Sequence, residues 1–455
     1  MRDCFLADPA PNKLNLAVGV YRTAHGKPLV LDCVQDAEIN LLADQKVGRR
    51  YKEYLPPEGM RDFCELSLKL LLGDAIAPAL SEGRVALAQS LSGTGGLHLA
   101  ARLVKQLMPS VTVYLPTPTW PIHPDVFAEV GLNIAYYPYY DPATRGFDAH
   151  AALAALHALP IGSVVLLHAC AHNPTGVDPT PAQWRAIAAA VEARRLIPLV
   201  DAAYLGLASG DIDVDSYGAR TLAAVPGVEM ITVQSYAKTM GLYAERAGVV
   251  AFVCNDADVA DRVRQQLVRT IRLTHSSPPM HGAAIAQMIL ADAALNAAWR
   301  SELRAMAQRL LEMRAALSAA LAKVECPPPP DASRGEPPAA RAAQGTEADA
   351  SAAAGADAPA PAGATGWQHV LEQRGMFTYT GLSPAHVQTL REKHHVYMPA
   401  DGRICMAALT SASCDTFAAA VKDVLVAEKE AGGVPEGDSP ARKRPRGLRG
   451  LACLS

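Results

Sequence analysis

The sequence contains no long apolar run. Half of its 455 residues are hydrophobic, yet no hydrophobic stretch reaches the roughly 18 residues that a membrane-spanning helix needs. Residues 1–13 have neither the apolar core of a signal peptide nor the Arg- and Ser-rich, acid-poor composition of a transit peptide. We therefore expect no membrane contact and a cytoplasmic location, or a mitochondrial one if a presequence precedes Met1 in the natural chain.

The sequence also lacks paired cysteines and an excess of charge. Its nine cysteines are scattered, with no Cys-x-x-Cys pair, which is typical of a reducing compartment. Only 19% of the residues are charged and the formal net charge is -3, so the bulk of the chain offers no electrostatic surface for nucleic acid or anionic membranes. These absences leave a globular protein of enzyme size as the starting expectation.

Short apolar runs alternate with helical patterns across the middle of the chain. The runs RVALAQSL, TVYLP, GSVVLLHAC, LIPLVD and EMITVQS have the length and composition of buried strands. Segments with helical spacing, such as GGLHLAARLVKQLM and PAQWRAIAAAVEARR, separate most of them. This alternation predicts an α/β fold with a mostly parallel sheet covered by helices, and it places ligands at the carboxyl ends of the strands.

Three further segments stand out by their composition. A helical pattern without Gly or Pro over residues 296–325 predicts one long connecting helix. Residues 326–365 contain no Val, Ile, Leu or aromatic residue, and we predict disorder there because the segment cannot bury enough apolar surface to offset the entropy cost of ordering. The basic end, residues 431–455, is predicted to be a second disordered segment rather than a nuclear-targeting or nucleic-acid patch.

The stretch SGTGG, residues 92–96, opens a helix after a predicted strand. Backbone N–H groups and hydroxyls at such a helix start suit a phosphate. The dinucleotide motif G-x-G-x-x-G fails, because its third glycine would fall on His98, and the chain has no G-K-[ST] motif. A plain turn explains these residues equally well, and a single phosphate is the sharper hypothesis.

Two more strand ends carry side chains that can bind a ligand. His168 and His172 are four residues apart and would suit a metal ion on a helix, but the preceding run SVVLL is a strand pattern. Asn173 follows in the turn NPTG, where its side chain can hydrogen-bond a ligand. Asp201 ends the next apolar run, where a carboxylate either caps a helix or pairs with a cation such as a protonated ring nitrogen.

Lys238 follows the apolar run EMITVQS and has no other charge close to it in sequence. A lysine just past a buried strand loses its ammonium charge more readily than a surface lysine and can act as an imine-forming amine, although most isolated lysines are surface residues. A phosphate loop, Asp201, Tyr204 and Lys238 at successive strand ends together match the needs of pyridoxal phosphate (PLP).

Longer motifs extend this pattern along nearly the whole chain. YLPTPTW, LLHACAHNPTGVDPT, DAAYLGLASGD, YAKTMGLYAERAG and GMFTYTGL occur in the order found in the PLP-dependent aminotransferases of class I and fold-type I. Within that family the sequence resembles the aspartate aminotransferases. The resemblance implies transfer of the amino group of L-aspartate to 2-oxoglutarate, giving oxaloacetate and L-glutamate, with PLP as cofactor and a homodimer that shares its active sites.

The resemblance also implies a role for each matched residue. Lys238 corresponds to the lysine that binds PLP covalently and then carries the proton, and Asp201 to the acid that keeps the ring nitrogen protonated. Tyr204 and Asn173 correspond to the hydrogen-bond donors to the ring oxygen, and Trp120 to the indole stacked on the ring. The predicted phosphate-binding residues are Ser92, Gly93, Thr94, Ser235, Arg246 and, from the partner subunit, Tyr54.

Two arginines are assigned to the two carboxylates of the substrate. Arg403 corresponds to the arginine that clamps the α-carboxylate with two parallel hydrogen bonds, and Arg272 to the one that a partner subunit donates to the side-chain carboxylate. The segment that closes over the substrate corresponds to Val18 and Gly19. The predicted substrate-binding set is Val18, Gly19, Trp120, Asn173, Arg272 and Arg403, and the predicted catalytic set is Lys238, Asp201 and Tyr204.

The same resemblance divides the chain between two domains. Residues 40–300 are assigned to a large PLP-binding domain. Residues 1–39, 301–325 and 366–430 are assigned to a smaller domain, whose sequence the predicted disordered insert interrupts.

Several residues depart from the family pattern. Thr239 and Ser277 replace asparagines, and Pro121 replaces the glycine after the stacking indole. None of them removes a residue assigned to the cofactor, so we expect activity. Two alternatives stay open: an aromatic amino-acid aminotransferase on the same scaffold, and a non-catalytic paralogue that binds partners through its insert and tail.

Overall fold

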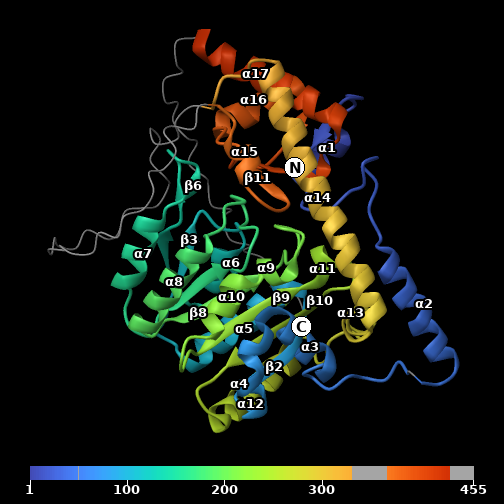
Figure 1. Ribbon diagram of the computed structural model, residues 1–455, viewed down its shortest axis with the longest axis vertical. Helices are drawn as coiled ribbons and strands as arrows, with labels where there is room; N and C mark the ends of the chain where they lie inside the picture. Colours follow the sequence, from blue (N-terminus) through green and yellow to red (C-terminus); the bar gives the residue numbers. More distant parts are fainter. Residues whose placement is uncertain (50, 330–365, 431–455) are drawn as a thin grey trace, which may run out of the picture.

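Figure 1 shows the protein as a computed structural model, which describes residues 1–49, 51–329 and 366–430. Most of the segment predicted to be disordered, residues 330–365, and the basic end, residues 431–455, lie outside the described residues. Among the helices within the described ranges, none combines the length and the apolar character that crossing a membrane requires.

The first residues of the predicted disordered insert, 326–329, are among the described residues, and the disorder of the insert stays a prediction. Trp367 Nε1 donates a hydrogen bond to the carbonyl oxygen of Pro327 at 3.1 Å, and Arg145 Nη2 donates one to that of Pro329 at 3.1 Å. A proline-rich run lacks large apolar side chains but keeps its carbonyl acceptors, and these fix it to neighbouring donors.

A seven-stranded sheet forms the centre of the fold and confirms the predicted α/β class. Its strands lie side by side in the order β2 (Val85–Leu91), β10 (Ala247–Val253), β9 (Met230–Ser235), β8 (Ile197–Ala202), β7 (Val164–His168), β3 (Thr112–Thr117) and β4 (Asn133–Pro138). Each predicted strand is present. β4 and β10 were not predicted. β10 runs antiparallel to both neighbours because only a short helix and a turn separate it from β9, too little chain for a parallel crossover.

Helices cover both faces of this sheet because alternate residues of each strand point to opposite sides. In β7, Val164 and Leu166 face one core, whereas Val165 and Leu167 face the other. The first core is shared with α5 (Ser92–Leu107), α6 (His123–Glu129) and α12 (Ala257–Thr274). The second is shared with α3 (Arg61–Leu72), α7 (Ala149–Ala158), α8 (Pro181–Arg194), α10 (Tyr217–Ala223) and α13 (His281–Ala291).

The predicted long helix is confirmed as α14 (Ala293–Lys323), which runs from the sheet to a second, smaller part of the molecule in Figure 1. That part contains α15 (His369–Glu372), β11 (Phe377–Tyr379), α16 (Pro384–His394), β12 (Val396–Tyr397), β13 (Arg403–Cys405), η3 (Met406–Ala408) and α17 (Ser411–Glu430). α14 packs against α15 and α17 there.

The beginning of the chain joins this smaller part. β1 (Leu14–Asn15) pairs in parallel with β12, and α1 (Arg2–Ala7) precedes it. The remaining elements are the 15-residue helix α2 (Asp32–Lys46) and the short η1 (Gly73–Ile76), α4 (Ala77–Ser81), β5 (Tyr140–Asp141), β6 (Gly146–Phe147), α9 (Ile212–Asp215) and α11 (Tyr236–Thr239). The assignment of the chain to two domains stays a prediction.

Candidate active site

The residues predicted to bind the cofactor gather at the carboxyl end of the sheet. All strands except β10 run in one direction, so the loops and helix starts that follow them meet at one edge. One cavity there is lined by ten predicted residues: Ser92, Gly93, Thr94, Trp120, Asn173, Asp201, Tyr204, Ser235, Lys238 and Arg246.

One end of this cavity carries groups that are chemically suited to a phosphate. α5 begins at Ser92, directly after β2, so the positive end of a 16-residue helix points at the cavity. The hydroxyls of Ser92 and Ser235 lie 2.7 Å apart, and the guanidinium of Arg246 lines the cavity with them. At Gly93 a β-carbon would lie 3.4 Å from that of Ser235, so the backbone of Gly93 lies close to that side chain. Hydroxyls, helix-start N–H groups and a guanidinium together fit a dianion.

Asp201 lies within β8 and faces the same cavity. Its Oδ2 atom is 3.2 Å from Nε2 of His123, and Nδ1 of His123 is 2.8 Å from the hydroxyl of Thr119. The side chain of Asp201 is 11% exposed, and its position inside a strand excludes the alternative role of a helix cap. A carboxylate held in this way can face a protonated ring nitrogen, which was the other prediction.

His168, at the end of β7, and His172 pack against each other and are not arranged as metal ligands. Thr119 Oγ1 is 3.2 Å from Nε2 of His168, and the ring of His172 lies against that of His168 at 4.1 Å between centroids. Burial lowers the pKa of His168 to about 3 and that of His172 far below its usual value, so both rings are neutral. Within the described ranges, no three His, Cys, Asp or Glu residues cluster as metal ligands.

Lys238 lies on the short helix α11, immediately after β9. Burial, and then the positive charges of Arg246 and Arg403, lower the pKa of Lys238 to about 8. Its Nζ atom lies 4.8 Å from the centre of the Tyr243 ring, a contact that the sequence did not suggest. The amine is therefore much closer to its uncharged, nucleophilic form at neutral pH than a surface lysine is.

Arg403 approaches the cavity from the smaller part of the molecule. Its Nη1 donates to Oδ1 of Asn173 at 3.0 Å, and its Nη2 to the carbonyl of Ala17 at 3.2 Å. The ring of Phe377 lies 4.3 Å from the guanidinium carbon. The buried Nε of Arg403 has no hydrogen-bond partner among the described residues, so a donor is available there for an incoming carboxylate.

The similarity to known proteins matches this geometry. The family model described as "Aminotransferase class I and II" matches residues 11–335 and 356–421 of the chain. The chain belongs to this family. Its matched residues include those that line the cavity with Lys238.

Three known proteins illustrate the similarity. The rice (Oryza sativa subsp. japonica) protein named "Aspartate aminotransferase, cytoplasmic" is 44% identical over 91% of this chain and 91% of its own length. The aspartate aminotransferase from the cytoplasm of Saccharomyces cerevisiae matches with a TM-score of 0.82 at 33% identity, over 93% of this chain and 95% of that one. An aromatic-amino-acid aminotransferase from Burkholderia pseudomallei, covalently bound to pyridoxal phosphate, matches with a TM-score of 0.79 at 37% identity and the same coverage. The predicted family and fold are thereby confirmed.

Besides Arg403, four predicted site residues of this aminotransferase lie outside the cavity's lining. The Tyr54 side chain is 86% exposed, and Arg272 donates from Nη1 to the hydroxyl of Ser276 at 2.8 Å on the surface. Val18 is 40% exposed, and a β-carbon on Gly19 would lie 2.8 Å from the Phe377 ring. Neither Tyr54 nor Arg272 lines the cavity with Lys238 within one chain, and their assignment to a partner's site stays a prediction.

The pKa of Lys238 leads to a pH prediction for this aminotransferase. The rate at which the PLP-free protein binds PLP covalently is expected to rise with pH and to reach half of its maximum near pH 8, because only the uncharged amine attacks. An ordinary lysine, with a pKa of about 10.4, would give a half-maximum more than two units higher. Stopped-flow absorbance of PLP against pH measures this, and a half-maximum near pH 10 would contradict the assigned environment.

Proposed function

We propose that this aminotransferase uses PLP to transfer the amino group of L-aspartate to 2-oxoglutarate, forming oxaloacetate and L-glutamate. The observation that carries the proposal is the meeting of Lys238, Asp201 and a phosphate-type helix start in one cavity, with Arg403 at its edge. The rice relative, 44% identical and named as an aspartate aminotransferase, supports the choice of substrate.

The side chains of the cavity fit PLP at both ends. Ser92, Ser235 and Arg246 would hold its phosphate, and Asp201 would face its ring nitrogen. Burial raises the pKa of Tyr204, so its phenol stays protonated and can donate to the ring oxygen. When bound, PLP supplies an electron sink for the electron pair left after a Cα–H bond breaks.

The protein's own groups then position the substrate and move its proton. Arg403 would bind the α-carboxylate, since its buried Nε is a free donor, and this fixes the Cα–H bond relative to Lys238. The uncharged Nζ of Lys238 would take the Cα proton and later return it one carbon away, as a general base and then a general acid. The negative charge of Asp201, held by His123, would favour a proton on the ring nitrogen.

A coupled assay tests this proposal. The visible absorbance of the purified protein is first recorded with PLP, and oxaloacetate formation from L-aspartate and 2-oxoglutarate is then followed with malate dehydrogenase and NADH. We expect PLP-dependent turnover of L-aspartate that exceeds turnover of L-phenylalanine. A strong preference for L-phenylalanine would favour the aromatic alternative, which the Burkholderia structure represents. Failure to bind PLP covalently would favour the non-catalytic alternative.

A homodimer with shared active sites belongs to the same proposal. Ile39, Leu42 and Val47 on and after α2, followed by Tyr51 and Tyr54, are large apolar or aromatic side chains that one chain leaves exposed. Figure 1 shows α2 on the outside of the molecule. A patch of this kind marks a protein-protein interface.

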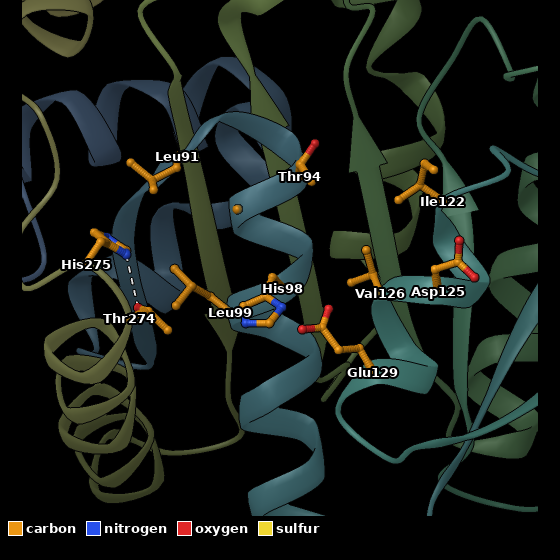
Figure 2. Close-up of a pocket in the computed structure, with 11 residues that line it drawn as sticks. Leu91, Thr94, His98, Leu99, Ile122, Asp125, Val126, Glu129, Thr274 and His275 are labelled. Atoms are coloured by element: carbon orange, nitrogen blue, oxygen red, sulfur yellow. Dashed lines mark hydrogen bonds between the residues drawn. The ribbon is translucent and has the colours of Figure 1, made fainter. Parts of the chain in front are cut away.

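A second cavity, shown in Figure 2, adjoins the one with Lys238. It measures about 490 Å³ and lies between α5, α6 and the residues that follow Arg272, including His275. Thr94 lines both this cavity and the one with Lys238. A second copy packed here would bring its own Arg272 and Tyr54 toward the phosphate end of the site.

Mixing two inactive variants tests the shared site. Lys238→Ala and Arg272→Ala subunits are each expected to be nearly inactive with L-aspartate, and unfolding and refolding them together at equal amounts should restore about a quarter of the wild-type activity. Half of the dimers are then hybrids, and each hybrid holds one intact site that combines Lys238 of one subunit with Arg272 of the other. A mixture no more active than its components would contradict the shared site.

We also propose a cytoplasmic location. The rice relative carries "cytoplasmic" in its name, which supports this choice. Eight cysteines of the described ranges are free thiols, which agrees with a reducing compartment.

A further inference from the structure

Tyr243 contacts three parts of the active site at once. It lies in the turn between α11 and β10, with Nζ of Lys238 4.8 Å from its ring centre. Its carbonyl oxygen accepts a hydrogen bond from Nη1 of Arg246 at 2.8 Å. Its hydroxyl oxygen accepts one from the backbone N–H of Tyr21, also at 2.8 Å. No role was assigned to Tyr243 from the sequence.

Residues 16–21 are held at both ends, and Tyr243 holds one of them. At the first end, the N–H of Leu16 donates to the carbonyl of Tyr397, and the carbonyl of Leu16 accepts from the N–H of Cys405, both at 2.8 Å. At the other end, the N–H of Tyr21 donates to the hydroxyl of Tyr243. Between these anchors lie the carbonyl that binds Arg403 and the two residues assigned to closure over the substrate, so the Tyr243 hydroxyl restrains that span.

The ring of Tyr243 has a second effect, on the amine. An aromatic face attracts an ammonium group, so the ring favours the charged form of Lys238 and a fixed position for it. Burial acts in the opposite direction and dominates, which leaves the pKa of Lys238 at about 8. Burial also raises the pKa of Tyr243 to about 12, so its hydroxyl is uncharged and accepts through a lone pair.

We propose that Tyr243 is a positioning residue that ties Lys238 and Arg246 to the segment of residues 16–21. Its ring, its backbone carbonyl and its hydroxyl thereby align the amine, the phosphate-binding guanidinium and the segment that closes over the substrate. The inference rests on the proposed function for the roles of Lys238 and Arg246. The hydrogen bond to Tyr21 and the ring contact with Lys238 are separate parts of this role, and two substitutions separate them.

Tyr243→Phe removes the acceptor for Tyr21 and keeps the ring over Lys238. We expect amide exchange at Tyr21 in the PLP-loaded protein to speed up about 3- to 10-fold, as the loss of one hydrogen bond implies. KM for L-aspartate should rise by about the same factor, and kcat should fall by less than about two-fold. The change affects the segment of residues 16–21, which closes over the substrate, rather than the amine of Lys238. Tyr114→Phe is the control: that hydroxyl makes no hydrogen bond within the described part of the chain, and we expect no change.

Tyr243→Leu removes the ring as well. The pH at which covalent PLP binding reaches half of its maximum should fall by about half a unit to one unit below that of Tyr243→Phe, because the ammonium form loses the aromatic face. The exchange rate at Tyr21 should match that of Tyr243→Phe, since both variants lack the hydroxyl. A merely structural role would change melting temperature without moving this pH midpoint.

The outcomes separate this inference from the proposed function. Unchanged amide exchange at Tyr21 and unchanged KM in Tyr243→Phe would contradict the restraint of residues 16–21 by the Tyr243 hydroxyl. Equal pH midpoints of covalent PLP binding for the Phe and Leu variants would contradict the role of the ring. Amide exchange at Tyr21 and covalent PLP binding can both be measured without turnover of a substrate. A wild-type protein that binds PLP but does not transaminate L-aspartate would contradict the proposed function and leave the exchange test of Tyr243 intact.

Discussion

Lys238→Ala is expected to lower the rate of amino transfer from L-aspartate to 2-oxoglutarate by about 10⁴-fold or more, the upper range for loss of a general base. The cavity offers no substitute: its other basic side chain is the guanidinium of Arg246, which cannot give up a proton at these pH values. The coupled assay measures the rate, and the visible spectrum reports whether PLP is still attached to the protein.

Two further variants make this test specific. Lys238→Arg keeps a cation at the same position but has no uncharged form, so it is expected to be as inactive as the alanine variant. Lys69→Ala, on the exposed side of α3, removes an unrelated lysine and is expected to keep full activity. Activity of Lys238→Ala or Lys238→Arg within ten-fold of the wild type would exclude Lys238 as the base.

The sequence predicted the parts of the site that follow strands. Each strand end carried its own signal, such as the SGTGG stretch at Ser92 or the carboxylate of Asp201 after an apolar run. A parallel sheet brings such ends together without further information, so the ten-residue cavity followed from local patterns and the family resemblance. The long helix α14 was predicted to within three residues at each end for the same reason, since its apolar spacing is local.

Contacts between distant segments could not be predicted in this way. The hydroxyl of Tyr243 meets the N–H of Tyr21 across 222 positions, and Arg403 meets Asn173 across 230. Neither pair has a local pattern, because the contact depends on how the smaller part of the molecule lies against the sheet. The hydrogen bonds to the carbonyls of Pro327 and Pro329 depended in the same way on neighbours that sequence spacing does not specify.

Substitutions of the two arginines assigned to the substrate's carboxylates are expected to affect the turnover of two substrates differently. Arg403→Leu should lower kcat/KM for both L-aspartate and L-phenylalanine by about 10²- to 10³-fold, because both substrates carry the α-carboxylate that this arginine binds. Arg272→Leu should lower kcat/KM for L-aspartate by a similar factor and change it for L-phenylalanine by less than about three-fold, because only L-aspartate has a second carboxylate to pair. Steady-state kinetics on both amino acids measure the four ratios.

The matched control is Arg262→Leu, an exposed arginine on the same helix as Arg272, which should leave both substrates unaffected. An equal loss for both substrates in Arg272→Leu would show that this arginine supports the interface or the fold rather than the side-chain carboxylate. An Arg403→Leu variant that still turns over L-phenylalanine normally would contradict the α-carboxylate site. Because Arg272 lies on the surface of one chain, a loss confined to L-aspartate would also require the arginine to act in a partner's site, which links substrate choice to the dimer.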